Sequence, residues 1–340
     1  MATRTDPKTA FASNSLRTPT NSKLILFHFI TMANETCILQ IAGGLGKHLY
    51  LTAAVKVLKN NFPDRDVICV VAWPELFSSL PEVKRVYPLG QTQYFHSEYI
   101  EGKDPLIFAQ EVYYHTDHVL QRSSLIETWC KVYGLQYNGE KPYVKINPEQ
   151  RKAIRNFYEP KLEGKPFLLI HTAGGLFTNQ NPYSWARDMP IDVATKVADH
   201  FRKTHFIMQI CRPSAPKIPD VFVRNEQLSN TELIGLLELT DKRLLIDSSL
   251  QHGAACLGLE STVLWNATSP VIFGHSLHDN ITAKEKPQKD LPGAYLFKFQ
   301  FDGNPEEMPY EEEDLKDLYN IDQIIASLEA QSNTPSKGFG

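Results

Sequence analysis

The sequence predicts an α/β protein built from two Rossmann-like, parallel-sheet domains that face each other across a cleft. A chain of 340 residues is longer than one hydrophobic core usually organises. Short apolar segments typical of buried parallel strands alternate along it with segments of helical periodicity. The opening of this pattern, an apolar strand that runs into two adjacent glycines, occurs twice, at 36–44 and at 167–175.

The N-terminal domain is predicted to span residues 35–163. Its expected strands are 36–42, 67–72, 83–87 and 144–146, and its expected helices are 49–58, 76–80, 124–133 and 148–157. Residues 91–117 are rich in Tyr, Phe and His and have no clear period. They fit either a substrate-facing insertion or the start of the next α/β unit.

The C-terminal domain is predicted to span residues 164–305. Its expected strands are 167–171, 206–210, 244–246 and 262–265, and its expected helices are 192–202, 230–239 and 250–257. A helix at 321–328 is predicted within a C-terminal segment, 306–340. Residues 1–34, rich in Thr, Ser and Asn, are predicted to be a disordered extension, so Met32 is an alternative translation start.

Composition argues against a nucleic-acid-binding protein, a disulfide-linked protein and a membrane-spanning protein. The net charge of −4 gives no reason to expect a nucleic-acid partner. The five cysteines are scattered, odd in number and without a C-x-x-C pair, which favours a reducing compartment and hence the cytoplasm. No apolar stretch approaches the roughly 20 residues of a membrane-spanning helix, so any membrane association is expected to be peripheral.

Residues 43–48 (GGLGKH) lie between the first strand and its helix and predict a ligand-binding loop. A dinucleotide fingerprint does not fit, because no acidic residue follows the second strand, and this disfavours a Rossmann oxidoreductase. A P-loop does not fit either, because Ile41 stands where its first glycine is needed and His48 where Ser or Thr is needed.

A second motif covers residues 247–255 (DSSLQHGAA). Asp247 or Ser248 can cap the helix that follows. Capping does not explain His252, one turn into a helix that is otherwise apolar and small. A histidine at that place can hydrogen-bond a phosphate or a ribose.

The second motif, the strand 262–265 (TVLW) and the later Phe273-Gly274 resemble the C-terminal signature of glycosyltransferase family 9, which includes the lipopolysaccharide heptosyltransferases. The opening Gly43-Gly44-Leu45-Gly46 and the Tyr183-Ser184-Trp185 element resemble two further motifs of this family. The resemblance spans about residues 36–275 and implies the two-domain GT-B fold.

The resemblance also implies a function and a site. The protein would be an inverting glycosyltransferase that needs no metal and no cofactor. It would move a heptose-like sugar, or another hexose or heptose, from a nucleotide diphosphate sugar to a glycan or glycolipid acceptor. The family pattern places the donor against Thr172, Gly174, Gly175, Asp247, Ser248, Ser249 and His252. The acceptor would meet the loop that contains Gly43, Gly44 and Gly46.

The sequence departs from the family at three positions. Lys47 stands where the family has its catalytic aspartate, Ser249 replaces a motif glycine, and no lysine directly precedes the Trp185 element. Lys47 and His48 are the catalytic candidates, and His48, Glu98 or Asp104 is a candidate for a relocated base. Lys47 can instead bind an acidic acceptor or a phosphate.

The alternative to an enzyme is a GT-B-like protein that binds a nucleotide or glycan and has lost transfer. His115, Asp117 and His118 form a possible metal set, but their context favours polar loop residues over metal ligands.

Overall fold

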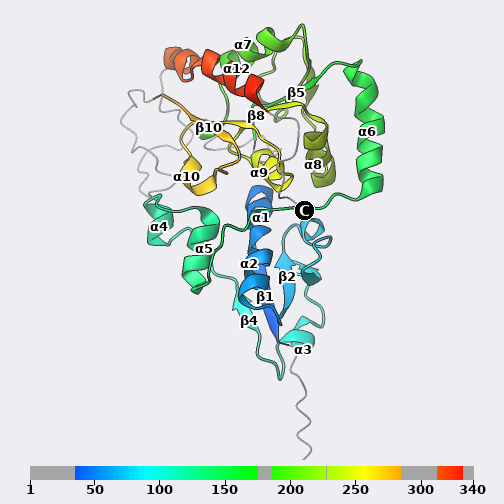
Figure 1. Ribbon diagram of the computed structural model, residues 1–340, viewed down its shortest axis with the longest axis vertical. Helices are drawn as coiled ribbons and strands as arrows, with labels where there is room; N and C mark the ends of the chain where they lie inside the picture. The colour runs from blue at the N-terminus through cyan, green and yellow to red at the C-terminus, as the bar shows by residue number, and fades with distance from the viewer. Residues whose placement is uncertain (1–34, 175–185, 227, 285–311, 332–340) are drawn as a thin grey trace, which may run out of the picture. The chain divides into compact units, whose positions relative to one another are not determined.

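A computed structural model describes residues 35–174, 186–226, 228–284 and 312–331. The predicted extension 1–34, residues 285–311, Gly175 and the Tyr183–Trp185 element lie outside these residues. Within the described ranges two parallel sheets form (Figure 1), so the predicted pair of parallel-sheet α/β units is confirmed.

The N-terminal sheet has the strand order β3-β2-β1-β4. Its strands are β1 (Thr36–Ile41), β2 (Asp66–Val71), β3 (Val83–Pro88) and β4 (Leu106–Phe108). All three pairings are parallel. One face carries the buried side chains of Cys37, Leu39 and Ile41 and packs against α1 (Leu45–Leu51), α2 (Ala53–Asn61) and α5 (Leu125–Tyr133). The other face packs against α3 (Phe95–Tyr99).

The C-terminal sheet has the order β10-β9-β8-β5-β6-β7, again with parallel pairings. Its strands are β5 (Phe167–His171), β6 (Phe206–Ile210), β7 (Phe222–Arg224), β8 (Lys242–Ile246), β9 (Thr262–Trp265) and β10 (Asp279–Thr282). Helices α7 (Ile191–Phe201) and α12 (Ile321–Ala330) cover one face. Helices α6 (Pro148–Leu162), α8 (Asn230–Leu239) and α9 (Ser249–Cys256) cover the other.

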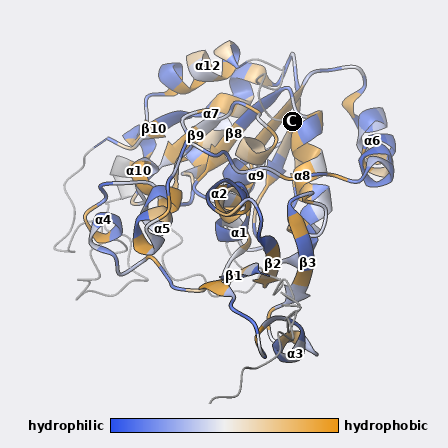
Figure 2. Cartoon of the chain, turned by 60° about the horizontal axis from the view of Figure 1, so that its bottom comes forward, coloured by the Kyte–Doolittle hydropathy of each residue, from blue (hydrophilic) through white to orange (hydrophobic). Residues whose placement is uncertain are grey.

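Helix α6 packs against the C-terminal sheet. The domain border predicted at residue 163 instead placed this helix in the N-terminal domain. Its Ile154 and Tyr158 side chains share one core cluster with Phe167 of β5. Gly235 of α8 makes room for this contact, because a Cβ there would lie 2.3 Å from the Ile154 side chain. Figure 2 shows α6 with both hydrophilic and hydrophobic turns, as expected of a helix with one packed side.

Several local predictions change. The strand predicted at 144–146 is wrong, since the chain there has no regular structure. The predicted helix 49–58 is divided at Thr52, whose hydroxyl donates to the Leu49 carbonyl at 2.8 Å and accepts the Tyr143 N–H at 2.9 Å. The segment 91–117, for which the sequence left two interpretations, contains α3, β4 and the start of α4 (Thr116–Val119).

Helix α5 follows its sequence signals closely. Ser124 and Glu127 form a capping box, and Gly134 ends the helix with a φ of 62°. All five cysteines are buried free thiols. Among the described residues no helix is both long and apolar enough to span a membrane.

Candidate active site

The loops after β1 and β8 meet because α1 and α9 pack side by side. Gly46, in the first turn of α1, allows this approach. A Cβ there would lie 3.0 Å from the His252 ring and 3.5 Å from the backbone of Ser249. Further along, the Cys256 thiol lies 3.4 Å from the Leu49 carbonyl oxygen. The carboxyl ends of strands from both sheets therefore border one region, where open parallel sheets bind their ligands.

The first loop, residues 43–48, contains a tight turn whose backbone groups contact the buried His48 ring. Gly43 has a φ of +101°, a conformation that favours glycine. Burial lowers the pKa of the fully buried His48. Its Nδ1 lies 2.9 Å from the Gly44 carbonyl oxygen, and its Nε2 lies 3.0 Å from the Ile41 carbonyl oxygen and 3.2 Å from the Ala72 nitrogen, so both ring nitrogens have partners within the fold. A base needs an open nitrogen, so this geometry gives His48 a structural part in the loop.

Lys47 is held by a carboxylate that the sequence did not single out. Its Nζ lies 2.5 Å from both carboxylate oxygens of Glu111, which follows β4. The ammonium also lies 5.1 Å from the centre of the Tyr113 ring. The Lys47 side chain is 12% exposed and that of Glu111 is 42% exposed. Lys47 is therefore paired, while Glu111 faces solvent.

Glu98 and Asp104, the other carboxylates considered for the base, lie elsewhere on the N-terminal sheet. Glu98 accepts hydrogen bonds from Arg85 at 2.7 Å and from the Tyr87 hydroxyl at 2.8 Å. The backbone carbonyl of Asp104 accepts from Arg65, which also pairs with Glu35 just before β1. Asp104 therefore lies at the amino-terminal edge of the sheet, opposite the edge that carries the loop.

On the C-terminal side, Ser248 joins the loops after β5 and β8. Its hydroxyl accepts the Leu250 N–H at 3.3 Å as the cap of α9 and lies 2.9 Å from Nδ1 of His171. Burial lowers the pKa of His171 to about 4, so the ring is neutral and can accept the Ser248 proton. A Cβ on Gly174 would lie 3.2 Å from the Ser248 Cβ, so the Gly174 backbone closely approaches the Ser248 side chain.

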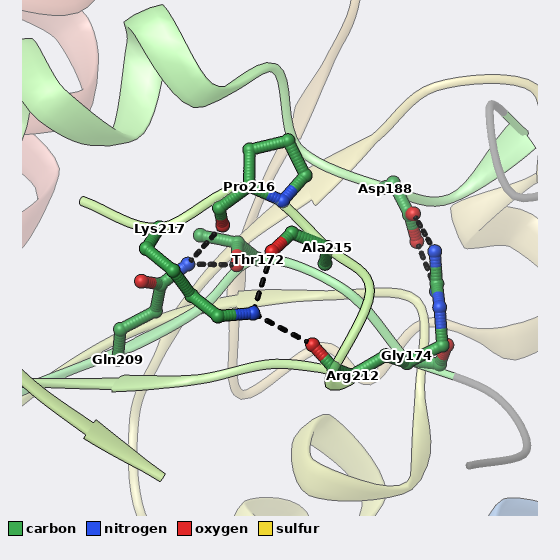
Figure 3. A network of polar contacts seen from close by, with 8 residues as sticks. All are labelled: Thr172, Gly174, Asp188, Gln209, Arg212, Ala215, Pro216 and Lys217. Carbon is green, nitrogen blue, oxygen red and sulfur yellow. Dashed lines mark hydrogen bonds and ion pairs between the residues drawn. The ribbon is translucent and has the colours of Figure 1, made fainter. Parts of the chain in front are cut away.

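A polar network behind this contact fixes the turn 172–174 (Figure 3). Arg212 makes a two-pronged ion pair with Asp188, at 2.6 and 3.1 Å, and donates to the Gly174 carbonyl. The Thr172 hydroxyl, 3% exposed, accepts from Gln209 at 2.7 Å. Thr172 thus supports the turn through its side chain and presents no free hydroxyl to a ligand.

The side chains of Arg187 and Asp247 form a charged pair at the same edge. Their closest atoms are 3.4 Å apart, with Arg187 52% exposed and Asp247 6% exposed. Asp247 Oδ2 is buried and accepts no hydrogen bond from a described residue. Burial, with the nearby Glu111 and Asp247 carboxylates, raises the pKa of Tyr113 to about 12. Tyr113 therefore lies within electrostatic reach of charges from both sheets.

His252 lies between α1 and α9 and not on an open surface. It is 5% exposed, and its Nδ1 lies 2.9 Å from Nε2 of His275. The Tyr50 ring stacks on His275 with centroids 4.7 Å apart. Burial lowers the pKa of His252 to about 3. The described geometry supports a positioning part for His252 behind the first turn of α9.

A cavity of about 560 Å³ adjoins this histidine cluster. It is lined from the N-terminal side by Tyr50 and the start of α5, and from the C-terminal side by His275 and α10 (Pro270–Phe273). It flanks the α1–α9 pair and is separate from the pair's amino-terminal ends.

The possible metal set is not assembled. His115 caps α4 by accepting the Asp117 N–H, Asp117 pairs with Lys131 at 2.6 Å, and the His118 ring packs edge-on against Tyr113 and Phe273. Throughout the part of the chain that the structure describes, no group of three or more His, Cys, Asp or Glu side chains is arranged to hold a metal ion.

Solved structures similar to this chain include glycosyltransferases. The family 9 glycosyl transferase of Veillonella parvula matches with a TM-score of 0.63 and 13% identity, over 87% of this chain and 96% of that one. The Escherichia coli ADP-heptose heptosyltransferase II matches at 0.54 and 13%, over 73% and 89%. The heptosyltransferase TibC, solved with ADP-D-β-D-heptose, matches at 0.60 and 11%, over 87% and 76%.

The chain therefore has the GT-B fold of glycosyltransferase family 9, as the sequence resemblance implied. No protein-family model matches the sequence, and no curated protein matches it.

Two side chains at the site, those of Glu111 and Arg187, belong to none of the motifs identified in the sequence. Glu111 lies 64 residues from Lys47, so only the pairing of β4 with β1 brings them together. Arg187 follows Trp185 by two residues, and that proximity was the available signal.

Proposed function

We propose that the protein is a glycosyltransferase that moves a sugar from a nucleotide diphosphate sugar to a hydroxyl group of a glycan or glycolipid. One observation carries the proposal. The close approach of Gly174 to Ser248, the amino end of α9 and the half-exposed Arg187 lie at one edge. Lys47 of the first loop and Glu111, which follows β4, pair on the N-terminal side, and the fold likeness supports the same function.

The donor diphosphate would bind at the start of α9. Amide groups of the first turn and the helix dipole favour an anion there. Ser248 and Ser249 bring hydroxyls to this end, and Gly174 keeps the facing turn free of a side chain. Arg187 can contact the phosphate oxygens with two N–H groups.

The buried Asp247 would hold a hydroxyl of the donor. Its Oδ2 is paired with Arg187 at 3.4 Å but accepts no hydrogen bond from a described residue, so a ligand hydroxyl could still donate to it. Ribose and sugar hydroxyls are the donors that a nucleotide sugar offers. Arg187 lies 3.4 Å from this carboxylate, so one pair of side chains would contact both the diphosphate and a hydroxyl.

The reaction proposed is a direct displacement with inversion. The acceptor oxygen attacks the anomeric carbon while the bond from that carbon to the phosphate oxygen breaks, and a base takes the acceptor proton. Arg187 and the α9 amides would stabilise the charge that develops on the departing diphosphate. Gly43 and Gly44 lie on the open side of the first loop, where a Cβ on Gly44 would meet nothing within 4 Å, so they would face the acceptor.

Nucleoside diphosphates test the donor site directly. We expect one of ADP, GDP, UDP or CDP to raise the melting temperature, because a ligand at 100 times its Kd stabilises the native state by about 2.7 kcal/mol. Arg187→Gln and Ser248→Ala should each weaken that nucleotide about tenfold. Arg155→Gln removes an arginine from an exposed pair on α6 and is the matched control. No response to any of the four nucleotides would refute the donor site.

Turnover separates transfer from binding alone. ADP-D-β-D-heptose is the first probe because the structure of TibC, which shares the fold, contains it. UDP-glucose and GDP-mannose extend the panel. Release of the nucleoside diphosphate, with water as the acceptor, indicates an enzyme. Tight nucleotide binding without release from any donor would favour the alternative of a binding protein that has lost transfer.

A further inference from the structure

Lys47 and Glu111 form a carboxylate–ammonium pair at the place where the first loop meets the cleft edge. The lysine lies 2.5 Å from both carboxylate oxygens, so it occupies one lone pair on each. Each oxygen keeps a second lone pair, and the Glu111 side chain is 42% exposed. An ionised carboxylate is thus held in place with acceptor capacity directed away from the lysine.

The segment that carries Glu111 is anchored on both sides. Phe108 and Val112 are buried in the N-terminal core. The Gln110 N–H, next to Glu111, donates to the Tyr133 hydroxyl, and the Tyr133 ring packs against Phe108 with centroids 5.0 Å apart. The carboxylate is therefore fixed by core contacts and does not sit on a free loop.

The position also borders the proposed donor site. A Cβ on Gly46, the residue before Lys47, would lie 3.5 Å from the Ser249 backbone at the start of α9. The Lys47–Glu111 pair is therefore next to the helix end at which the donor diphosphate is proposed to bind. A sugar held between the two loops would therefore have Glu111 on the acceptor side and Arg187 on the diphosphate side.

We propose that Glu111 is the catalytic base and that Lys47 is its positioning residue, an inference that rests on the proposed transfer function. The acceptor O–H proton moves to a Glu111 oxygen as the acceptor oxygen forms its bond to the anomeric carbon. The electrons of the broken carbon–oxygen bond leave with the diphosphate. In this way the carboxylate missing at position 47 is supplied by the strand that pairs with β1.

Lys47 has two effects in this arrangement. Before reaction its ammonium group holds the Glu111 carboxylate in place through contacts of 2.5 Å to both oxygens. Once Glu111 has taken the proton, the Lys47 charge is no longer balanced by a carboxylate and favours the negative charge building up on the leaving group. An arginine can perform both tasks, whereas an uncharged side chain performs neither.

The test compares variants in donor turnover, with the nucleotide-induced melting shift as the check on folding and donor binding. Glu111→Gln should lower turnover by about 10²–10⁴-fold, as removal of a general base does, while its melting shift stays that of the wild type. Glu238→Gln is the matched control, because Glu238 also pairs with a cationic side chain, Arg151 at 2.6 Å, but lies on α8. It should leave both readouts unchanged.

Chemical rescue distinguishes a base from a structural carboxylate. Azide is a nucleophile that carries no proton to remove, so it should restore donor turnover to Glu111→Ala and give a glycosyl azide. It should not rescue Arg187→Gln, whose defect would lie in donor binding. Lys47→Arg should keep turnover within about threefold of wild type, whereas Lys47→Met should lose about tenfold or more.

The outcomes separate the two claims. Wild-type turnover in Glu111→Gln, or failure of azide to rescue Glu111→Ala that still binds nucleotide, would overturn the base and leave the transferase intact. A wild-type chain that binds nucleotide but turns over no donor would overturn the transferase, and the base with it.

Discussion

At the scale of single residues, His118 connects the stability of the protein to pH. Its ring is 2% exposed and lies edge-on to Tyr113 and Phe273, and its Nδ1 has no hydrogen-bond partner among the described residues. Burial lowers the pKa of His118 to about 4. Between its ordinary pKa of 6.5 and pH 4 the unfolded chain binds a proton that the folded chain does not.

The free energy of unfolding should therefore fall as the pH drops from about 7 to 5, and His118→Phe should remove part of that fall. The phenyl ring keeps the aromatic contacts and binds no proton, so the variant should lose about 1–2 kcal/mol less than the wild type over this range. Urea unfolding midpoints at the two pH values measure this. An equal fall in both proteins would show that His118 is protonated in the folded state.

The residues of the site divide into those that local sequence reveals and those that it cannot. Asp247 or Ser248 was predicted to cap α9, and the structure shows Ser248 as the cap, a feature that depends on neighbours in the chain. The salt bridge of Lys47 with Glu111 depends on the register of β4 against β1, which no local pattern encodes. Likewise, only the packed turn shows that His48 is enclosed.

At the scale of elements, the packing of α1 on α9 rests on Gly46. Gly46→Val should destabilise the protein by about 1–3 kcal/mol, because its side chain would meet the His252 ring and the Ser249 backbone. Gly44→Ser is the matched control, since nothing lies within 4 Å of a Cβ there and serine is a good cap at the residue before α1. Thermal or urea unfolding compares them, and similar losses in both variants would contradict close packing at Gly46.

Element prediction succeeded where an apolar run or a helical period was clear and failed where the pattern was weak. The strands 167–171, 206–210 and 262–265 and the helix 230–239 have the predicted bounds. β4 and β7 contain three residues each, too few to show a period, and only one of the four residues of β10 is buried. α6 was read as a helix, but its partner sheet was not predicted, because an amphipathic face does not specify what it packs against.

At the scale of the whole described chain, the sequence predicted two parallel sheets but not how their loops share contacts. Repetition of the strand–glycine opening was sufficient for the first, since each unit must bury its own sheet. Gly253 of α9 makes room for Leu237 of α8, whereas the close passage of α1 and α9 depends on Gly46. That contact makes the two sheets neighbours at the proposed donor site.

Binding of the donor should therefore affect both helices of that contact, α1 and α9. A nucleoside diphosphate bound at the start of α9 restrains a turn that α1 touches through Gly46, so slow opening of either helix must break the same contact. We expect saturating nucleotide to slow amide hydrogen exchange in α9 and in α1 together. Exchange in α3, which packs on the far face of the N-terminal sheet, should not change. Protection confined to α9 would show that the nucleotide is held by the C-terminal sheet alone, without coupling to the loop that carries Lys47.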